Sequence, residues 1–118
     1  MSTILVSGIE FYGYHGVAER ERAIGHRFEV DVELEVSERA SETDDVADTV
    51  DYGAVAAQIV AIGEGTSHRT VERLARLMAD AVLAENRTVA EVTIEVSKLL
   101  PPIPSVVRAA GVRLTVGR

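Results

Sequence analysis

Hydrophobic and polar residues alternate without exception over residues 28–36, which read Phe-Glu-Val-Asp-Val-Glu-Leu-Glu-Val. A period of two residues is typical of a β-strand with one buried and one solvated face, and the solvated face here is acidic. Residues 3–12 alternate less strictly and predict a second strand, in which Gly8 is the expected site of a bulge or of a close backbone approach. We expect the two strands to be antiparallel neighbours.

The segment that joins these two strands is too long for a tight hairpin turn. It begins with Tyr12-Gly13-Tyr14-His15-Gly16 and continues through a charged stretch to Gly25. A connection of this length is a candidate functional loop. After the second strand, residues 41–51 are rich in Asp, Ser and Thr, which favour turns and helix starts, so this stretch is expected to lead from a strand into a helix.

Two later segments have the period of about 3.6 residues that is typical of helices. Residues 52–62 predict the first helix, with Asp51 as its N-cap and with Gly63 and Gly65 as its stop signal. A second helix is predicted over residues 71–82, where the apolar side chains form one stripe.

Thr70 is the expected cap of this second helix. Alternation returns at residues 92–96 and at residues 112–116, and Pro101-Pro102-Ile103-Pro104 breaks the chain between them. The predicted order is therefore strand, strand, helix, helix, strand, strand. Paired strands around a helical middle favour an α+β fold, a four-stranded antiparallel sheet with both helices on one face.

The length of 118 residues is that of one ordinary domain, so we expect residues 1–118 to form a single domain with one core. A chain this small has little material for a deep pocket of its own. No apolar run approaches the ~20 residues of a membrane span, and the N-terminus lacks the layout of a signal peptide, so the expected location is the cytoplasm. The net charge of −7 argues against a nucleic-acid partner.

Lys98 is the only lysine among the 12 basic side chains. Arg and Lys serve about equally on a solvated surface, but only Lys can be deprotonated near neutral pH, so Arg cannot replace it at a proton-transfer site. The alternative is an arginine-biased composition that left one surface lysine. The apolar, rigid run Leu99 to Pro104 directly after Lys98 would desolvate the ammonium and favours a functional role.

Sequence motifs for other kinds of catalytic or binding site were not found in the chain. The chain has no cysteine, and His15, His26 and His68 lack metal-ligand spacing, so we expect no metal site. The acidic residues of the 41–51 stretch lack the order of a calcium loop. A serine-nucleophile elbow, a dinucleotide loop and a triphosphate loop are likewise missing, so no cofactor is expected.

Five motifs lie in collinear order over nearly the whole chain: Phe11-Tyr12-Gly13-Tyr14-His15-Gly16; Glu21 with Ile24-Gly25 and the strand 28–36; Thr43-Asp44-Asp45-Val46-Ala47-Asp48-Thr49-Val50-Asp51-Tyr52; Val71-Glu72-Arg73-Leu74-Ala75; and Lys98 with Pro101-Pro102-Ile103-Pro104. Together they closely resemble the dihydroneopterin aldolase family of folate biosynthesis. The resemblance implies the tunnelling fold, with strands and helices in the order ββααββ. It also implies that sheets of several subunits pair into a ring-shaped barrel, as a homo-tetramer or as two stacked rings in a homo-octamer.

The chemistry that this resemblance implies is a retro-aldol cleavage of 7,8-dihydroneopterin into 6-hydroxymethyl-7,8-dihydropterin and glycolaldehyde. The pterin ring accepts the electrons of the broken bond, so neither a metal nor a cofactor is required. The protein moves protons and holds the ring. A slow 7,8-dihydroneopterin epimerase activity can accompany the cleavage.

Carried over by position, the catalytic residues are Lys98, Tyr52 and Glu21. Lys98 would transfer the proton of the substrate hydroxyl, and Tyr52, from a neighbouring subunit, would help to reprotonate the enol. Glu21 would meet the side-chain hydroxyls or hold Lys98. Without the family pattern, Glu21 would be an exposed charge in a charged run and Tyr52 a packing residue.

Glu72 would accept paired hydrogen bonds from the pterin 2-amino group and a ring N–H, with a backbone contact from Val71 beside it. Val50 and Tyr52 complete the implied substrate-binding set with Glu21. Glu72 alone would otherwise be a surface charge favoured by the helix dipole. His26 stands where the family usually has Gln, so we expect the contacts to the substrate tail to differ here.

Two alternative functions remain open at this stage. One is the related epimerase that acts on dihydroneopterin triphosphate, although a triphosphate needs a basic cradle and few basic residues lie near the expected site. The other is a catalytically silent pterin-binding subunit with the same fold.

Overall fold

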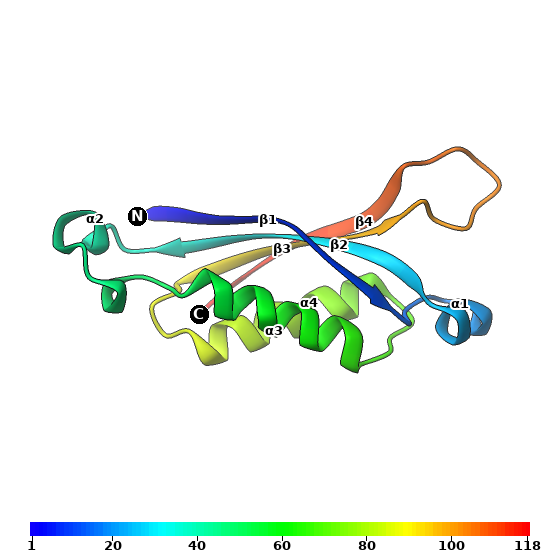
Figure 1. The fold of residues 1–118 in the computed structure, drawn as a ribbon, viewed down its shortest axis with the longest axis horizontal. Helices are drawn as coiled ribbons and strands as arrows, with labels where there is room; N and C mark the ends of the chain where they lie inside the picture. The colour runs from blue at the N-terminus through cyan, green and yellow to red at the C-terminus, as the bar shows by residue number, and fades with distance from the viewer.

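The computed structural model describes residues 1–118 and contains one four-stranded antiparallel sheet with the strand order β1-β2-β3-β4. The strands are β1 (Ser2–Gly13), β2 (His26–Val36), β3 (Glu91–Leu99) and β4 (Ala109–Gly117). Two long helices, α3 (Tyr52–Gly65) and α4 (Val71–Glu85), cover one face of the sheet, α3 against β1 and α4 against β3 and β4 (Figure 1). The predicted α+β arrangement is confirmed.

The alternation in β2 separates the core from the solvent as the sequence predicts. Its apolar side chains point toward the helices and are buried, whereas its acidic side chains lie on the uncovered face of the sheet. The register places Glu10 opposite Glu29 and Asp31 opposite Glu95 on this face. Like charges opposite each other repel. Ion pairs of Glu10 with Arg27 and of Glu95 with Arg113 on the same face offset part of this repulsion.

A bulge in β1 lies at Gly8, as predicted. Val6 pairs with Val32 and Ile9 pairs with Val30, so β1 has one more residue than β2 between these two pairs. The extra residue shifts the inward-facing positions from even to odd numbers, which keeps Ile9 and the residues after it on the core side. Gly8 has a φ of 74°, a conformation that glycine adopts without strain.

Both predicted helix caps are confirmed. The side chain of Asp51 accepts a hydrogen bond from the amide of Ala54 at 3.1 Å, at the start of α3. The hydroxyl of Thr70 accepts one from the amide of Arg73 at 3.2 Å, at the start of α4. Each cap satisfies one of the amides that a helix leaves without a partner in its first turn.

The predicted stop of α3 at Gly63 is wrong, because the helix continues through Gly65. Gly63 instead permits close packing: a Cβ atom at this position would lie 2.5 Å from Cε2 of the Phe11 ring. The glycine therefore lets the last turn of α3 approach the end of β1. Its presence in the sequence had suggested the end of the helix.

Three short elements were not predicted. These are α1 (Glu19–Ile24) between β1 and β2, and α2 (Arg39–Thr43) and the 3-10 turn η1 (Val46–Asp48) between β2 and α3. They are too short to show a hydrophobic period, so only the tertiary fold reveals them. None of the helices has both the length and the apolar character needed to cross a bilayer.

Gly63→Ala should lower the free energy of unfolding by about 1–3 kcal/mol, because the added methyl group would overlap the Phe11 ring. Urea denaturation would measure this. Gly65→Ala is the matched control, since a Cβ there meets nothing within 4 Å and the change should stay within about 1 kcal/mol of the parent. Equal effects of the two substitutions would contradict the packing role of Gly63.

Candidate active site

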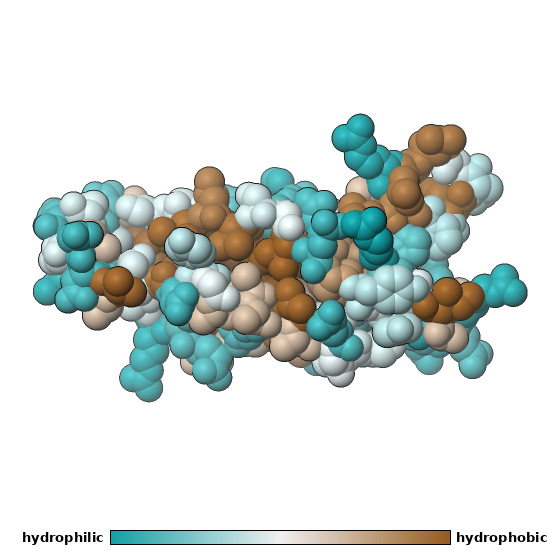
Figure 2. Space-filling view, in the orientation of Figure 1, coloured by the Kyte–Doolittle hydropathy of each residue, from teal (hydrophilic) through white to brown (hydrophobic).

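A cleft of about 570 Å³ opens at one end of the sheet, where the segment before α1, the start of α4 and the β3–β4 loop meet. This volume lies within the range of about 300–1,000 Å³ that is usual for small-molecule sites. The cleft brings together four of the predicted site residues, namely Glu21, Val71, Glu72 and Lys98. Pro101 and Ile103 of the β3–β4 loop form part of its rim, and this loop projects from the molecule with hydrophobic atoms on its surface (Figure 2).

Lys98 lies near the end of β3, opposite Phe28 of β2, and only 13% of its side chain is exposed. Its Nζ atom lies 5.6 Å from the centroid of the Phe28 ring and 3.5 Å from Oε2 of Glu21. The Glu21 side chain, 27% exposed, comes from α1. A proton donor or acceptor thus faces the cleft from an apolar floor, with one carboxylate to orient it.

A further wall of the cleft is the first turn of α4, which contributes Val71 and Glu72. Amides in the first turn have no acceptor within the helix, and the helix dipole makes this end positive. A carboxylate beside such amides presents two acceptor oxygens next to N–H donors. This combination suits a flat heterocycle that carries adjacent N–H and carbonyl groups.

Two predicted site residues, Tyr52 and Val50, lie elsewhere. Tyr52 opens α3 and is 65% exposed, whereas the cleft lies near the other end of that helix, at Gly63. Eleven residues separate Tyr52 from Gly63, which corresponds to about 16 Å along the helix axis. The side chain of Val50 is buried in the core, so only its backbone is available to a ligand.

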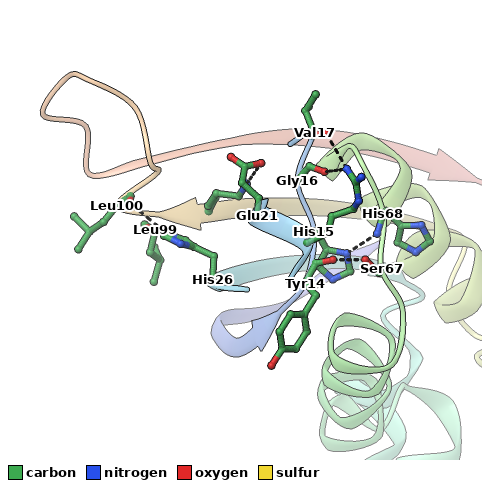
Figure 3. A network of polar contacts seen from close by, with 12 residues as sticks. Tyr14, His15, Gly16, Val17, Glu21, His26, Ser67, His68, Leu99 and Leu100 are labelled. Carbon is green, nitrogen blue, oxygen red and sulfur yellow. Dashed lines mark hydrogen bonds and ion pairs between the residues drawn. The ribbon is translucent and has the colours of Figure 1, made fainter. Parts of the chain in front are cut away.

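His26 occupies a position that sequence reasoning associated with the substrate tail. In the structure its Nε2 atom donates to the carbonyl of Leu99 and, at 3.1 Å, to the carbonyl of Leu100 (Figure 3). Leu100 has a φ of 49°, at the point where the chain turns from β3 into the loop. His26 therefore fastens the backbone just after Lys98, and it also lines a smaller cavity of about 140 Å³ together with Glu21 and Lys98.

His15 and His68, which lack metal-ligand spacing in the sequence, form a stacked pair beside the cleft. Their ring centroids lie 5.6 Å apart with an interplanar angle of 7°. Nε2 of His15 donates to the carbonyl of Gly63 at 2.8 Å, and the amide of His68 donates to Nδ1 of His15 at 3.1 Å. Since Nδ1 accepts, the proton of the neutral ring is on Nε2.

Burial lowers the pKa of His15, and the neighbouring charges of His68 and Lys98 act in the same direction, while the bond to Gly63 opposes them. Burial also lowers the pKa of His68, with Arg73 adding to the effect. Both rings are therefore neutral at neutral pH. No group of three or more His, Asp or Glu side chains is placed to hold a metal ion.

This chain is similar in sequence and in fold to known proteins. The family model described as "FolB: Dihydroneopterin aldolase" matches residues 4–115. The chain belongs to the dihydroneopterin aldolase family.

Its relatives cover nearly its whole length. It is 38% identical to the dihydroneopterin aldolase of Bacillus subtilis over 117 residues, 98% of this chain and 97% of that protein. It is also 38% identical to the dihydroneopterin aldolase of Staphylococcus epidermidis over 112 residues, 94% of this chain and 93% of that protein. The structure of E. coli dihydroneopterin aldolase in complex with neopterin matches with a TM-score of 0.89 and 27% identity over 99% of this chain and 100% of that one.

The resemblance inferred from the five motifs is thereby confirmed, and with it the assignment of this chain as an aldehyde-lyase of folate biosynthesis. The motifs named the residues, and the fold brings four of them into one cleft. His15 and the His26 contact to β3 are features of the site that sequence reasoning missed. In the sequence, these two histidines are distinguished only by their positions inside or next to a motif. Their hydrogen-bond partners come from distant segments, which the local sequence does not reveal.

The free energy of unfolding should fall as the pH is lowered from about 7.5 to about 5.5. The unfolded chain takes up protons on His15 and His68 near their ordinary pKa of 6.5, whereas the folded chain keeps both rings neutral. Urea denaturation at a series of pH values would measure this loss. His15→Asn should reduce the slope, and an identical slope in the variant would contradict the assignment to His15.

Proposed function

We propose that the cleft between Lys98 and the first turn of α4 is where this chain cleaves 7,8-dihydroneopterin into 6-hydroxymethyl-7,8-dihydropterin and glycolaldehyde. The observation that carries this proposal is that the only lysine, 3.5 Å from Oε2 of Glu21, lines the same cleft as Val71 and Glu72. The related E. coli enzyme, whose fold matches closely, is in complex with neopterin, which supports a pterin as the ligand.

Retro-aldol cleavage requires that a base remove the proton from the hydroxyl on the carbon that becomes the aldehyde. The bond to the neighbouring carbon then breaks, and its electron pair passes into the dihydropterin ring as an enamine. A proton returned to that neighbouring carbon completes the hydroxymethyl product. The protein needs to supply only two proton transfers and a fixed ring, so the absence of a thiol from the chain is no obstacle.

Lys98 is the proposed base for the hydroxyl proton. Its Nζ atom sits on the apolar floor formed by Phe28, where little water competes with a substrate hydroxyl. Glu21 is the carboxylate within ion-pair distance of Nζ, and a hydroxyl that enters between the two groups can bond to both. Glu21 therefore orients the amine before substrate arrives and the hydroxyl afterwards.

Glu72 and Val71 are the proposed anchors of the pterin ring. The Glu72 carboxylate accepts from the 2-amino group and an adjacent ring N–H, while the Val71 backbone contacts the neighbouring ring atoms. This holds the ring at the α4 wall, so that the side chain of the substrate extends toward the amine. The orientation of the substrate follows because the α4 wall carries the hydrogen-bond acceptor for the ring and Lys98 is the base.

Tyr52 reaches such a site only from a second copy of the chain, because about 16 Å of α3 separates it from the cleft of its own subunit. Its ring is 65% exposed and is therefore accessible to a second subunit. We therefore propose a homo-oligomer, a tetrameric ring or a stacked octamer, in which Tyr52 and the backbone at Val50 complete the cleft of a neighbour and Tyr52 helps to reprotonate the enol.

The triphosphate epimerase is less well supported by the cleft. Beside Lys98, the only basic residue that lines it is Arg69, and a triphosphate requires several cations. A silent pterin-binding subunit would have no need of a desolvated lysine that faces a carboxylate. A slow epimerase activity on dihydroneopterin itself is compatible with the same two proton-transfer groups.

Lys98→Arg should abolish glycolaldehyde release from 7,8-dihydroneopterin, lowering kcat by about 100-fold or more, because Arg keeps the charge but does not give up its proton. Neopterin affinity should change little, since the ring is held at the other wall. Arg76→Lys, an exchange between the same residue types on the exposed side of α4, is the matched control and should leave kcat unaltered.

The same assay separates the alternatives. Turnover of dihydroneopterin triphosphate in preference to dihydroneopterin, without glycolaldehyde, would support the epimerase and contradict the aldolase assignment. Pterin binding without turnover of either compound would support the silent subunit. Unchanged kcat in Lys98→Arg would remove Lys98 from the mechanism.

A shared site predicts complementation between two inactive variants. Lys98→Ala and Tyr52→Ala should each be inactive alone, and subunits mixed in equal amounts during refolding should regain up to about a quarter of the parental activity. The reason is that about one site in four then takes its lysine from a Tyr52→Ala subunit and its tyrosine from a Lys98→Ala subunit, so that both residues are present. A site built within one chain would show no recovery, and size-exclusion chromatography would confirm that the variants still assemble.

A further inference from the structure

One buried side chain, His15, lies in the segment to which both walls of the cleft are bonded. Its ring is fully buried, edge-on to Phe28 with ring centroids 5.3 Å apart, and stacked on His68. His15 does not line the cleft, so any effect on the reaction passes through the residues that it holds. The mechanism proposed above gives it no role.

The first wall is connected to His15 through the loop that precedes α4. The bond from the His68 amide to Nδ1 of His15 is one of three that bind the two segments (Figure 3). The amide of Gly16 donates to the carbonyl of His68 at 2.9 Å, and the hydroxyl of Ser67 donates to the carbonyl of Tyr14. Residues 14–16 and 67–68 therefore lie side by side as a short ladder.

The second wall is connected to the same ladder through α1. Nη1 of Arg22 donates to the carbonyl of Gly16 at 2.9 Å and to the carbonyl of Val17 at 2.8 Å. Arg22 follows Glu21 directly, so these bonds set the position of the α1 turn that carries the carboxylate facing Lys98.

His68 lies only two residues before Thr70, the cap of α4. A backbone that is bonded at both its amide and its carbonyl at residue 68 has little freedom left before the helix begins. The place where α4 starts determines where the Val71 backbone and the Glu72 carboxylate point. Of the bonds in the ladder, the one to Nδ1 of His15 is the one made by a side chain that is itself locked, because its Nε2 is bonded to Gly63.

We propose that His15 is a positioning residue for the aldolase reaction: its Nδ1 acceptor holds the His68 amide and thereby sets the start of α4, with Val71 and Glu72, against the Glu21 and Lys98 wall. This inference rests on the proposed role of Glu72 as the pterin anchor. If His15 were only a structural residue, loss of the bond to Nδ1 and loss of the bond to Nε2 would affect pterin affinity equally.

Two substitutions of His15 by an amide side chain distinguish the roles of its two ring nitrogens. In His15→Asn the side-chain oxygen occupies the place of Nδ1 and still accepts from the His68 amide, whereas the donor to Gly63 is lost. In His15→Gln the terminal amide reaches the place of Nε2 and still donates to Gly63, whereas the acceptor for His68 is lost. Each variant therefore keeps one of the two bonds.

Neopterin affinity, measured by titration well below the unfolding temperature of both variants, should be weaker in His15→Gln than in His15→Asn by about fivefold or more. KM for dihydroneopterin should follow the same order with a smaller effect on kcat. The His68 amide should exchange its hydrogen slowly in the parent and in His15→Asn and fast in His15→Gln. Equal affinities and equal exchange in the two variants would overturn the proposal.

Glu72→Gln distinguishes this inference from the proposed function. If Glu72→Gln does not weaken neopterin binding, the anchor assignment itself fails. If Glu72→Gln weakens it by about tenfold or more while the two His15 variants are alike, only the positioning role fails. Should both His15 variants fail to fold, the parent still decides: a His68 amide that exchanges fast in the parent contradicts the proposal, and a protected amide that becomes more protected with bound neopterin supports it.

Discussion

A sheet that is longer than the helices that cover it determines the shape of this protein. β1 has 12 residues and α4 has 15, which correspond to about 40 Å of strand but only about 22 Å of helix. The two helices therefore cover only part of the length of the sheet. At the end where the sheet extends past the helices, α1 and the β3–β4 loop meet the start of α4, and the cleft forms between them (Figure 1).

The cleft thus combines rigid and adjustable parts. Lys98 projects from β3, which is paired on both sides, so its position follows from the sheet register. Glu21 comes from the short helix α1 and Glu72 from the first turn of α4, and neither residue is part of the sheet. A ladder of backbone and side-chain bonds around His15 and an Arg22 contact hold them instead, and His26 holds the chain just beyond Lys98. A small domain in this way fixes acidic groups that lie far apart in its sequence.

The uncovered sheet face explains much of the net charge of −7. Acidic side chains of β1, β2 and β3 lie opposite one another there, and the helices bury none of them. Such a face does not favour an anionic ligand, and the cleft itself has few cations, which is consistent with an uncharged pterin rather than its triphosphate. Tyr52 is exposed at the far end of α3, and in the proposed oligomer it would complete the cleft of a neighbouring subunit.

The order of the six main elements, the faces of β2, the bulge at Gly8 and the caps at Asp51 and Thr70 could all be predicted from the sequence. Each of these depends on a period or a preference that acts within a few residues. Gly63 was misread as a helix stop, because its actual requirement, room for the Phe11 ring, comes from a strand far away in the chain. The short helices escaped prediction for lack of a period.

For the site, the sequence by itself determined which residue types were available: one lysine, no cysteine and a set of motifs that resembles one family. Only the tertiary structure decided that Glu21, Glu72 and Lys98 share a cleft, that Tyr52 lies outside it, and that His15 is buried at the junction of its walls. Such contacts join residues from different elements, and their distances depend on how the sheet and helices pack rather than on any local pattern.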